Sequence, residues 1–239
     1  MTGLRLALET SGPVGSVAVA DASGVRARRF LTERNRHAQV LPSAIDAVLA
    51  EVGAAWGDLT AVAVGVGPGS FTGVRVAAAT ANGIAHALDC PVWPVSSLAA
   101  AVLASEALPG STAPWPVDHG GAAPGRRRVL FDARGDRLFT AVYDVGAGAL
   151  IEVEAPRFAR LSDVLTRPAA DVFCGDAAVR HRDVLEGTGS RVLDPPAGVP
   201  TADGVLAVWA RSPGEPVAAG AWSPSYLRET GAVRARDET

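Results

Sequence analysis

The sequence contains no lysine, and all 22 of its basic residues are arginine. Schiff-base catalysis and the nucleotide-binding phosphate loop that depends on a lysine are therefore excluded. Only two cysteines are present, which is too few for a disulfide framework or a cysteine metal site. The four histidines are never three or four residues apart, so no helix can present a histidine pair to a metal ion.

The chain also lacks an apolar run long enough to cross a bilayer. Its start, MTGLRLALET, is not a basic segment followed by a long apolar one, so no signal peptide is predicted. These absences predict a cytoplasmic protein with no membrane partner. The net charge of −3 provides no overall attraction for nucleic acid.

What is present is an ordered succession of apolar segments, with 48% of all residues hydrophobic. Their spacing predicts strands at 4–10, 15–21, 25–31, 60–66 and 91–95, and helices at 36–52 and 70–88. After a stretch rich in proline and glycine at 108–125, a similar layout begins again. Asp132 and Asp144 flank the second hairpin as Glu9 and Asp21 flank the first. Helices at 161–167, 177–187 and 202–211 and a strand at 171–176 follow.

Two consecutive β-β-β-α-β-α units predict an α/β protein with the duplicated ribonuclease H-like fold of actin, sugar kinases and Hsp70 chaperones. Each lobe should contain a mixed sheet whose first three strands are antiparallel. We place the lobes at 1–107 and 108–239, with a linker at about 108–126 and a C-terminal segment that is free to return to the first lobe. In such an actin-like fold, acids such as Glu9, Asp132 and Asp176 would face the nucleotide cleft.

The stretch GVGPGSFTGVR, at 65–75, joins a predicted strand to a predicted helix. It fits neither the phosphate loop, nor the dinucleotide fingerprint, nor the nucleophile elbow, because each of these needs a residue that is missing here. Gly67, Pro68, Gly69 and Gly73 are interpreted as a structural turn, with Ser70 or Thr72 capping the helix. Binding of an anion at the helix N-terminus, close to Arg75, stays open as the alternative.

The longer segment GVGPGSFTGVRVAAATANGIA resembles the signature of the TsaB (YeaZ-like) family, the dimerisation subunit of the bacterial machinery that makes tRNA N6-threonylcarbamoyladenosine (t6A37). Four further segments resemble this family in the same order. They are the opening hairpin LALETS…GSVAVAD, the helix RNRHAQVLPSAIDAVL, the segment PVWPVSSLAA and the second hairpin DARGDRLFTAVYD. The closing PSYLRE is similar as well. The resemblance covers nearly the whole chain, although Glu9 stands where the family usually has aspartate.

The resemblance implies an actin-like fold without enzyme activity of its own. It implies pairing with a TsaD-type threonylcarbamoyltransferase, which modifies adenosine 37 of tRNAs that read ANN codons, and assembly with a TsaE-type ATPase. No cofactor is expected on this chain alone, because ATP, magnesium and metal belong to the partner subunits. Contact with tRNA is expected mainly through the complex, and a homodimer stays open. The second hypothesis is an independent actin-like ATPase or small-molecule kinase.

In this family the two N-terminal helices carry the pairing surface, and alanine occurs nearly all round the second of them here. The candidate interface therefore comprises His37, Leu41, Ser70, Phe71, Thr72, Arg75, Ala78, Ala81 and Ala85. The sequence leaves open whether these alanines face a partner or their own sheet. No catalytic or metal-binding residue is predicted, and Glu9 and Asp132 are interpreted as vestigial cleft acids. The arginines of GRRR, at 125–128, are expected in solvent, with contact to tRNA phosphate as the alternative.

Overall fold

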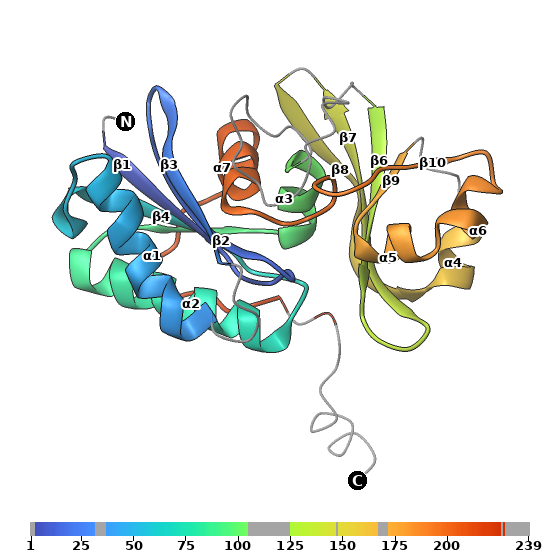
Figure 1. The fold of residues 1–239 in the computed structure, drawn as a ribbon, viewed down its shortest axis with the longest axis horizontal. Helices are drawn as coiled ribbons and strands as arrows, with labels where there is room; N and C mark the ends of the chain where they lie inside the picture. The colour runs from blue at the N-terminus through green and yellow to red at the C-terminus, as the bar shows by residue number, and fades with distance from the viewer. Residues whose placement is uncertain are drawn as a thin grey trace, which may run out of the picture.

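The structure is a computed structural model that describes residues 3–31, 37–104, 125–146, 148–166, 172–225 and 227 of the 239-residue chain. The chain forms two lobes, each built on a mixed five-stranded sheet. Two helices, α3 (Ser97–Leu103) and α7 (Ala202–Arg211), lie between the sheets (Figure 1). Most of the predicted linker, and half of the closing PSYLRE motif, lies outside the described residues.

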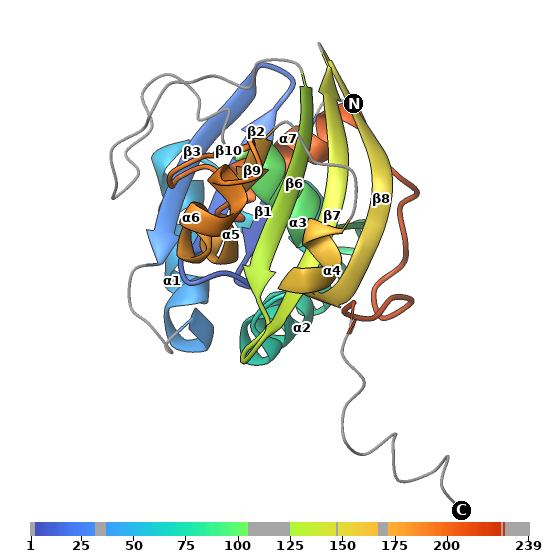
Figure 2. The same cartoon turned by 90° about the vertical axis from the view of Figure 1, so that its right-hand side faces the viewer.

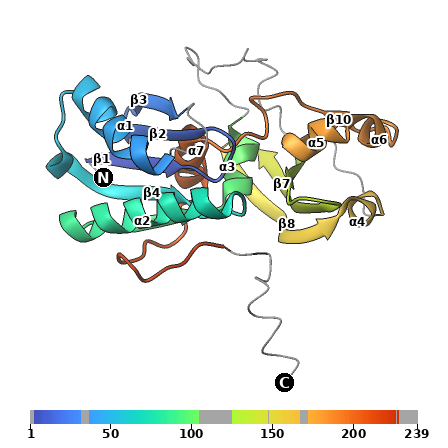
Figure 3. The same ribbon diagram turned by 60° about the horizontal axis from the view of Figure 1, so that its bottom comes forward.

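The first sheet has the strand order β3-β2-β1-β4-β5. Its strands are β1 (Leu4–Glu9), β2 (Gly15–Asp21), β3 (Gly24–Leu31), β4 (Leu59–Gly65) and β5 (Val92–Val95). The first three are antiparallel, whereas β4 and β5 run parallel to β1. On one face lie α1 (His37–Glu51) and α2 (Phe71–Leu88), and a short 3-10 helix, η1 (Trp56–Asp58), precedes β4. Figure 3 shows α1 and α2 on the same side of this sheet.

The second sheet repeats this order as β8-β7-β6-β9-β10. Its strands are β6 (Gly125–Asp132), β7 (Arg137–Gly146), β8 (Ala149–Arg160), β9 (Val172–Cys174) and β10 (Arg191–Val192). Here too the first three strands are antiparallel and the other two parallel. Glu9 and Asp132 therefore end equivalent strands, which confirms the predicted duplicated ribonuclease H-like fold. Three short helices, α4 (Leu161–Leu165), α5 (Asp176–Arg180) and α6 (Arg182–Glu186), cover its outer face (Figure 2).

Alternation along β1 explains how the first sheet is buried on both sides. Leu6 and Leu8 belong to the apolar cluster under α1 and α2, whereas Ala7 between them faces α3 and α7. This is the period-two pattern of a strand whose two faces are both covered. A sheet covered on both faces provides a rigid base for α2.

The core between the sheets joins the two lobes. It contains β5 and α7, whose Trp93 and Trp209 rings lie 4.6 Å apart, together with the inner faces of β6 and β7. The Arg127 guanidinium donates to the Val102 carbonyl at 3.2 Å across this core. After α7 the chain continues along the first lobe, where Val217 pairs with the edge strand β5. No helix within the described ranges is long and apolar enough to span a bilayer.

Three local expectations were wrong or incomplete. The segment predicted as one helix at 177–187 forms two, α5 and α6, because the backbone leaves helical geometry at His181. The third antiparallel strand of the second lobe was expected but not located in the sequence, and it is β8; strand β10 was not predicted. Of the arginines of GRRR, Arg126 is exposed as expected. Arg127 and Arg128 are instead buried in β6, where Arg128 forms a bidentate pair with Glu154 at 2.7 and 3.0 Å.

The close contact between α3 and α7 leads to a first prediction. A Cβ on Gly204 would lie 2.2 Å from the Ala100 carbonyl oxygen, so Gly204→Ala must push the two helices apart. We expect a loss of about 1–3 kcal/mol in the free energy of unfolding. Both lobes should still unfold in one transition, because they share this core. Chemical denaturation followed by circular dichroism measures both.

Gly83→Ala is the matched control, because Gly83 lies in α2 with no atom within 4 Å of its missing Cβ. This substitution should stabilise the protein by up to about 1 kcal/mol through helix propensity alone. Equal stability of the two variants would show that α3 and α7 are not in close contact.

Candidate functional site

The glycine-rich turn between β4 and α2 packs against the end of β1. Three consecutive residues at that end fill the space that a side chain would need at three glycine positions of the turn. The pairs are Glu9 with Gly65, Ser11 with Gly69 and Thr10 with Gly73. A Cβ on Gly65 would lie 1.9 Å from Glu9 Oε2, and one on Gly73 would lie 1.9 Å from the Thr10 carbonyl oxygen. These glycines are therefore required by close packing within the lobe.

Backbone donors of this turn bond to the protein itself. The Gly67 amide donates to Ser97 Oγ at 3.0 Å, and the Ser70 amide donates to the Ser11 carbonyl at 2.8 Å. Ser70 caps α2, because its hydroxyl accepts from the Gly73 amide at 3.3 Å. These three amides, of Gly67, Ser70 and Gly73, are therefore not available to an anion, which favours the structural interpretation of the turn.

Glu9 does not line a cleft, and its interpretation as a cleft acid is corrected. Its side chain is fully buried in the first lobe. Oε1 accepts from the Ser11 amide at 2.6 Å, and Oε2 accepts from the Ser97 hydroxyl at 2.7 Å. Burial raises the pKa of this carboxyl group above its ordinary value, and the hydrogen bonds only partly offset that effect. Glu9 therefore acts as a structural acceptor.

The equivalent place in the second lobe is also bonded internally. Asp132 forms an ion pair with Arg180 at 3.1 Å, and it accepts from the Arg134 amide at 3.2 Å. Asp176 accepts from the Asp132 and Ala177 amides, and burial raises its pKa. Among the described residues, no group of three or more histidine, cysteine, aspartate or glutamate side chains could hold a metal ion.

Several predicted partner contacts instead belong to the core of the first lobe. Leu41 and Ala81 are fully buried and Ala85 is 2% exposed, all within the cluster between α1, α2 and the sheet. Ala78 is buried as well. Their assignment to a partner surface was therefore wrong. Leu41 packs α1 against the sheet, and the alanines let α2 approach the same sheet closely. The side chain of His37 lies outside the described residues.

The remaining predicted residues are exposed at the start of α2. Ser70, Thr72 and Arg75 are exposed, and the Phe71 ring is 48% exposed with the Arg75 guanidinium 3.8 Å from its centroid. Such stacking of a cation on an aromatic ring holds both side chains in place. Phe71 thus presents a large apolar surface to solvent at a defined position.

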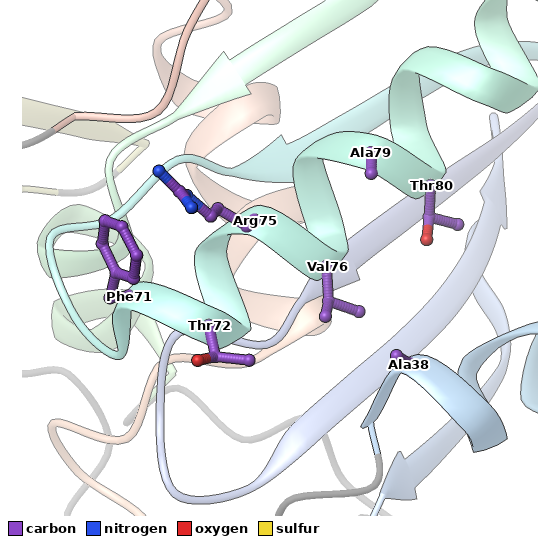
Figure 4. Close-up of a pocket in the computed structure, with 7 residues that line it drawn as sticks. All are labelled: Ala38, Phe71, Thr72, Arg75, Val76, Ala79 and Thr80. Atoms are coloured by element: carbon purple, nitrogen blue, oxygen red, sulfur yellow. The ribbon is translucent and has the colours of Figure 1, made fainter.

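A shallow groove of about 380 Å³ lies beside this pair, between α2 and the start of α1. Figure 4 shows Thr72, Val76 and Thr80 along the side of α2 that faces Ala38 of α1. Ala79 completes the lining together with Phe71 and Arg75. Ala38, Val76, Ala79 and Thr80 were not predicted. On α2, the helical spacing of Val76, Ala79 and Thr80 from Thr72 could have separated them from the buried alanines.

The burial of Glu9 leads to a prediction about pH. A folded-state pKa above the unfolded value of about 4.5 means that stability is lost as pH rises through the folded pKa. Glu9→Gln removes that loss, because a neutral amide keeps an oxygen for the Ser11 amide. The variant should therefore gain stability relative to the native protein as pH rises from about 4.5 toward neutrality. Denaturant titrations across this range measure the difference.

Asp21→Asn provides a control of opposite sign. Hydrogen bonds from Ser23, together with Arg26, lower the pKa of Asp21 to about 2. The stability that the Asp21 carboxylate adds to the folded protein is present above the unfolded pKa and is lost as pH falls. Asp21→Asn should therefore become less stable than the native protein as pH rises. If both variants changed in the same direction, the assignment of Glu9 as a buried acceptor would be incorrect.

Both the sequence and the fold of this chain match known proteins. The sequence model of the family described as "TsaD: tRNA N6-adenosine threonylcarbamoyltransferase" matches residues 31–180. The TsaB protein of Bacillus subtilis is 27% identical over 187 residues, which cover 76% of this chain and 74% of that protein. TsaB of Haemophilus influenzae is 43% identical over 95 residues, and the match spans 40% of each protein's length.

A solved structure of YeaZ from Pseudomonas aeruginosa has the same fold. It superimposes with a TM-score of 0.75 at 29% identity, covering 95% of this chain and all of that one. An uncharacterized protein of Mycobacterium tuberculosis is 31% identical over 169 residues, which cover 70% of both chains. The two lobes have the same strand order, and the first carries the glycine-rich turn. Together with these matches, this shows that the chain belongs to the TsaB/YeaZ family of t6A biosynthesis proteins.

Proposed function

We propose that this chain is a non-catalytic partner subunit. It binds a TsaD-type threonylcarbamoyltransferase through the exposed face of α1 and α2 and supports formation of t6A at adenosine 37 of ANN-decoding tRNAs. The observation that carries the proposal is the groove beside Phe71, because a half-exposed aromatic ring next to small side chains is typical of a docking surface. A TsaE-type ATPase joins the assembly, and tRNA is contacted through the complex.

The chemistry of the groove fits a helical partner. Ala38 and Ala79 leave the two backbones accessible, so a helix of the partner can approach closely and enclose the Phe71 ring. Arg75 lies at the edge of this apolar surface, where a carboxylate of the partner can pair with it without full desolvation.

The alternative, an independent ATPase or small-molecule kinase, has less support. The residues of the actin-like cleft do not fit a magnesium-bound nucleotide, because both Glu9 oxygens already accept hydrogen bonds inside the lobe. Pro200 lies against Gly12 in the turn after β1, where a Cβ would meet the proline ring at 2.8 Å. A nucleotide phosphate at this turn would have to displace Pro200.

Two measurements on the native protein test the proposal. Size-exclusion chromatography with the TsaD-type subunit of the same organism should give a stable complex, and depletion of this chain should lower t6A in tRNA. Isothermal titration of the isolated chain with Mg-ATP should give no binding. Turnover of ATP by the isolated chain, without any complex formation, would establish the kinase alternative instead.

Substitution in the groove gives a sharper prediction. Ala79→Arg places a long charged side chain on the exposed face of α2, where a docked helix would have to bury it. The affinity for the partner should fall by at least about a hundredfold, or roughly 3 kcal/mol. The melting temperature should stay near that of the native protein, because the side chain projects into solvent in the free chain. Titration calorimetry and thermal melting measure the two effects.

Ala22→Arg makes the same chemical change at an exposed site in the turn between β2 and β3, and it should leave the affinity unchanged. Ala81→Arg should instead unfold the chain, because Ala81 is fully buried. Native affinity in a folded Ala79→Arg variant would remove this face from the interface.

A further inference from the structure

A buried hydroxyl group is one of the contacts that hold the turn before the docking helix. Ser97, at the start of α3, is fully buried. Its Oγ donates to Glu9 Oε2 at 2.7 Å and accepts from the Gly67 amide at 3.0 Å. Its own amide donates to the Gly67 carbonyl at 2.9 Å. The end of β1, the start of α3 and the turn before α2 therefore meet at this side chain.

The position of the hydroxyl depends on Glu9. The Glu9 carboxylate is held at its other oxygen by the Ser11 amide, and it lies over Gly65, where no Cβ could be accommodated. Glu9 and Ser97 can therefore not move independently of the end of β4. A hydroxyl that bridges a buried carboxylate and a buried amide leaves both unsatisfied when it is removed.

Only three residues separate Gly67 from Phe71, the first residue of α2. A displacement at Gly67 is therefore transmitted directly to the Phe71 ring and to the groove. The Ser70 amide provides a second anchor through the Ser11 carbonyl, on the same hairpin that holds Glu9. A third bond runs from the Thr10 hydroxyl to the Gly73 carbonyl at 2.6 Å, so residues just after β1 hold the first turn of α2 directly.

We propose that Glu9 and Ser97 are positioning residues, which hold the turn at 65–69 and thereby fix the direction in which Phe71 faces a partner. This inference rests on the proposed docking function of α2. Neither residue touches the partner, because both side chains are fully buried. Their effect is exerted through the turn.

The test compares two serine-to-alanine variants. Ser97→Ala removes the bridging hydroxyl. Ser16→Ala removes another buried hydroxyl, which accepts from the Ala202 amide at 2.8 Å and joins β2 to α7 instead. Each variant loses an oxygen bonded to a backbone amide. Ser97→Ala also loses the bond to Glu9 and should therefore lose more stability. They differ in whether the affected amide belongs to the docking turn.

Amide hydrogen exchange on the isolated chain is the first readout. In Ser97→Ala the amides of Gly67 and Ser70 should exchange at least about tenfold faster than in the native protein. In Ser16→Ala those two amides should keep their native rates, while Ala202 exchanges faster. Affinity for the TsaD-type subunit is the second readout, and it should fall by about five- to tenfold in Ser97→Ala only.

Unchanged exchange at Gly67 in Ser97→Ala, or an equal loss of affinity in both variants, would overturn the proposal. Faster exchange with native affinity would overturn it as well, because the turn would then not control docking. If Ser97→Ala fails to fold, exchange in the native protein decides: the Gly67 amide must be protected by at least about a hundredfold over an unstructured chain. A native chain that binds no partner contradicts the proposed function, whereas the exchange data still decide the role of Ser97.

Discussion

The contact between the end of β1 and the glycine-rich turn is the constraint on which the arrangement of the first lobe depends. Three backbone or side-chain groups of residues 9–11 fill the positions that a side chain would take at Gly65, Gly69 and Gly73. Hydrogen bonds run across the same contact, including one from Thr10 Oγ1 to the Gly73 carbonyl at 2.6 Å. The segment ETS, at 9–11, and the motif GVGPGSFTG, at 65–73, therefore pack against each other as one unit. The start of α2 is the part of this unit that faces solvent.

A second constraint is the core that contains α3 and α7. Because apolar side chains of both sheets pack on these two helices, the lobes share one hydrophobic interior. In an actin-like enzyme the space between the lobes would admit a nucleotide, whereas here the segment that leads into α7 covers Gly12 with Pro200. The proposed docking role uses the surface instead, where the half-exposed ring of Phe71 lies next to the groove.

The sequence predicted the fold better than the site. Apolar periodicity located β1 to β5, α1 and α2, and the equal spacing of acids in the two hairpins identified the duplication. The sequence pattern could not tell which side of the alanine-rich helix α2 faces the sheet, because alanine is compatible with both a buried and an exposed position. Ala81 and Ala85 were therefore assigned to the surface, while Ala79 was missed. Arg128 looked solvated, because its partner Glu154 lies on β8, a strand that the pattern did not reveal. Contacts between distant segments decide such cases, and local patterns do not encode them.

The most direct test of the account is hydroxyl-radical footprinting of the chain with and without the TsaD-type subunit. Three large apolar side chains serve as probes on different elements: Phe71 on α2 is 48% exposed, Ile151 on β8 is 61% exposed and Val184 on α6 is 49% exposed. The account predicts that the partner protects Phe71 from oxidation and leaves Ile151 and Val184 at their native rates. Protection of Ile151 or Val184 with an unchanged rate at Phe71 would contradict it.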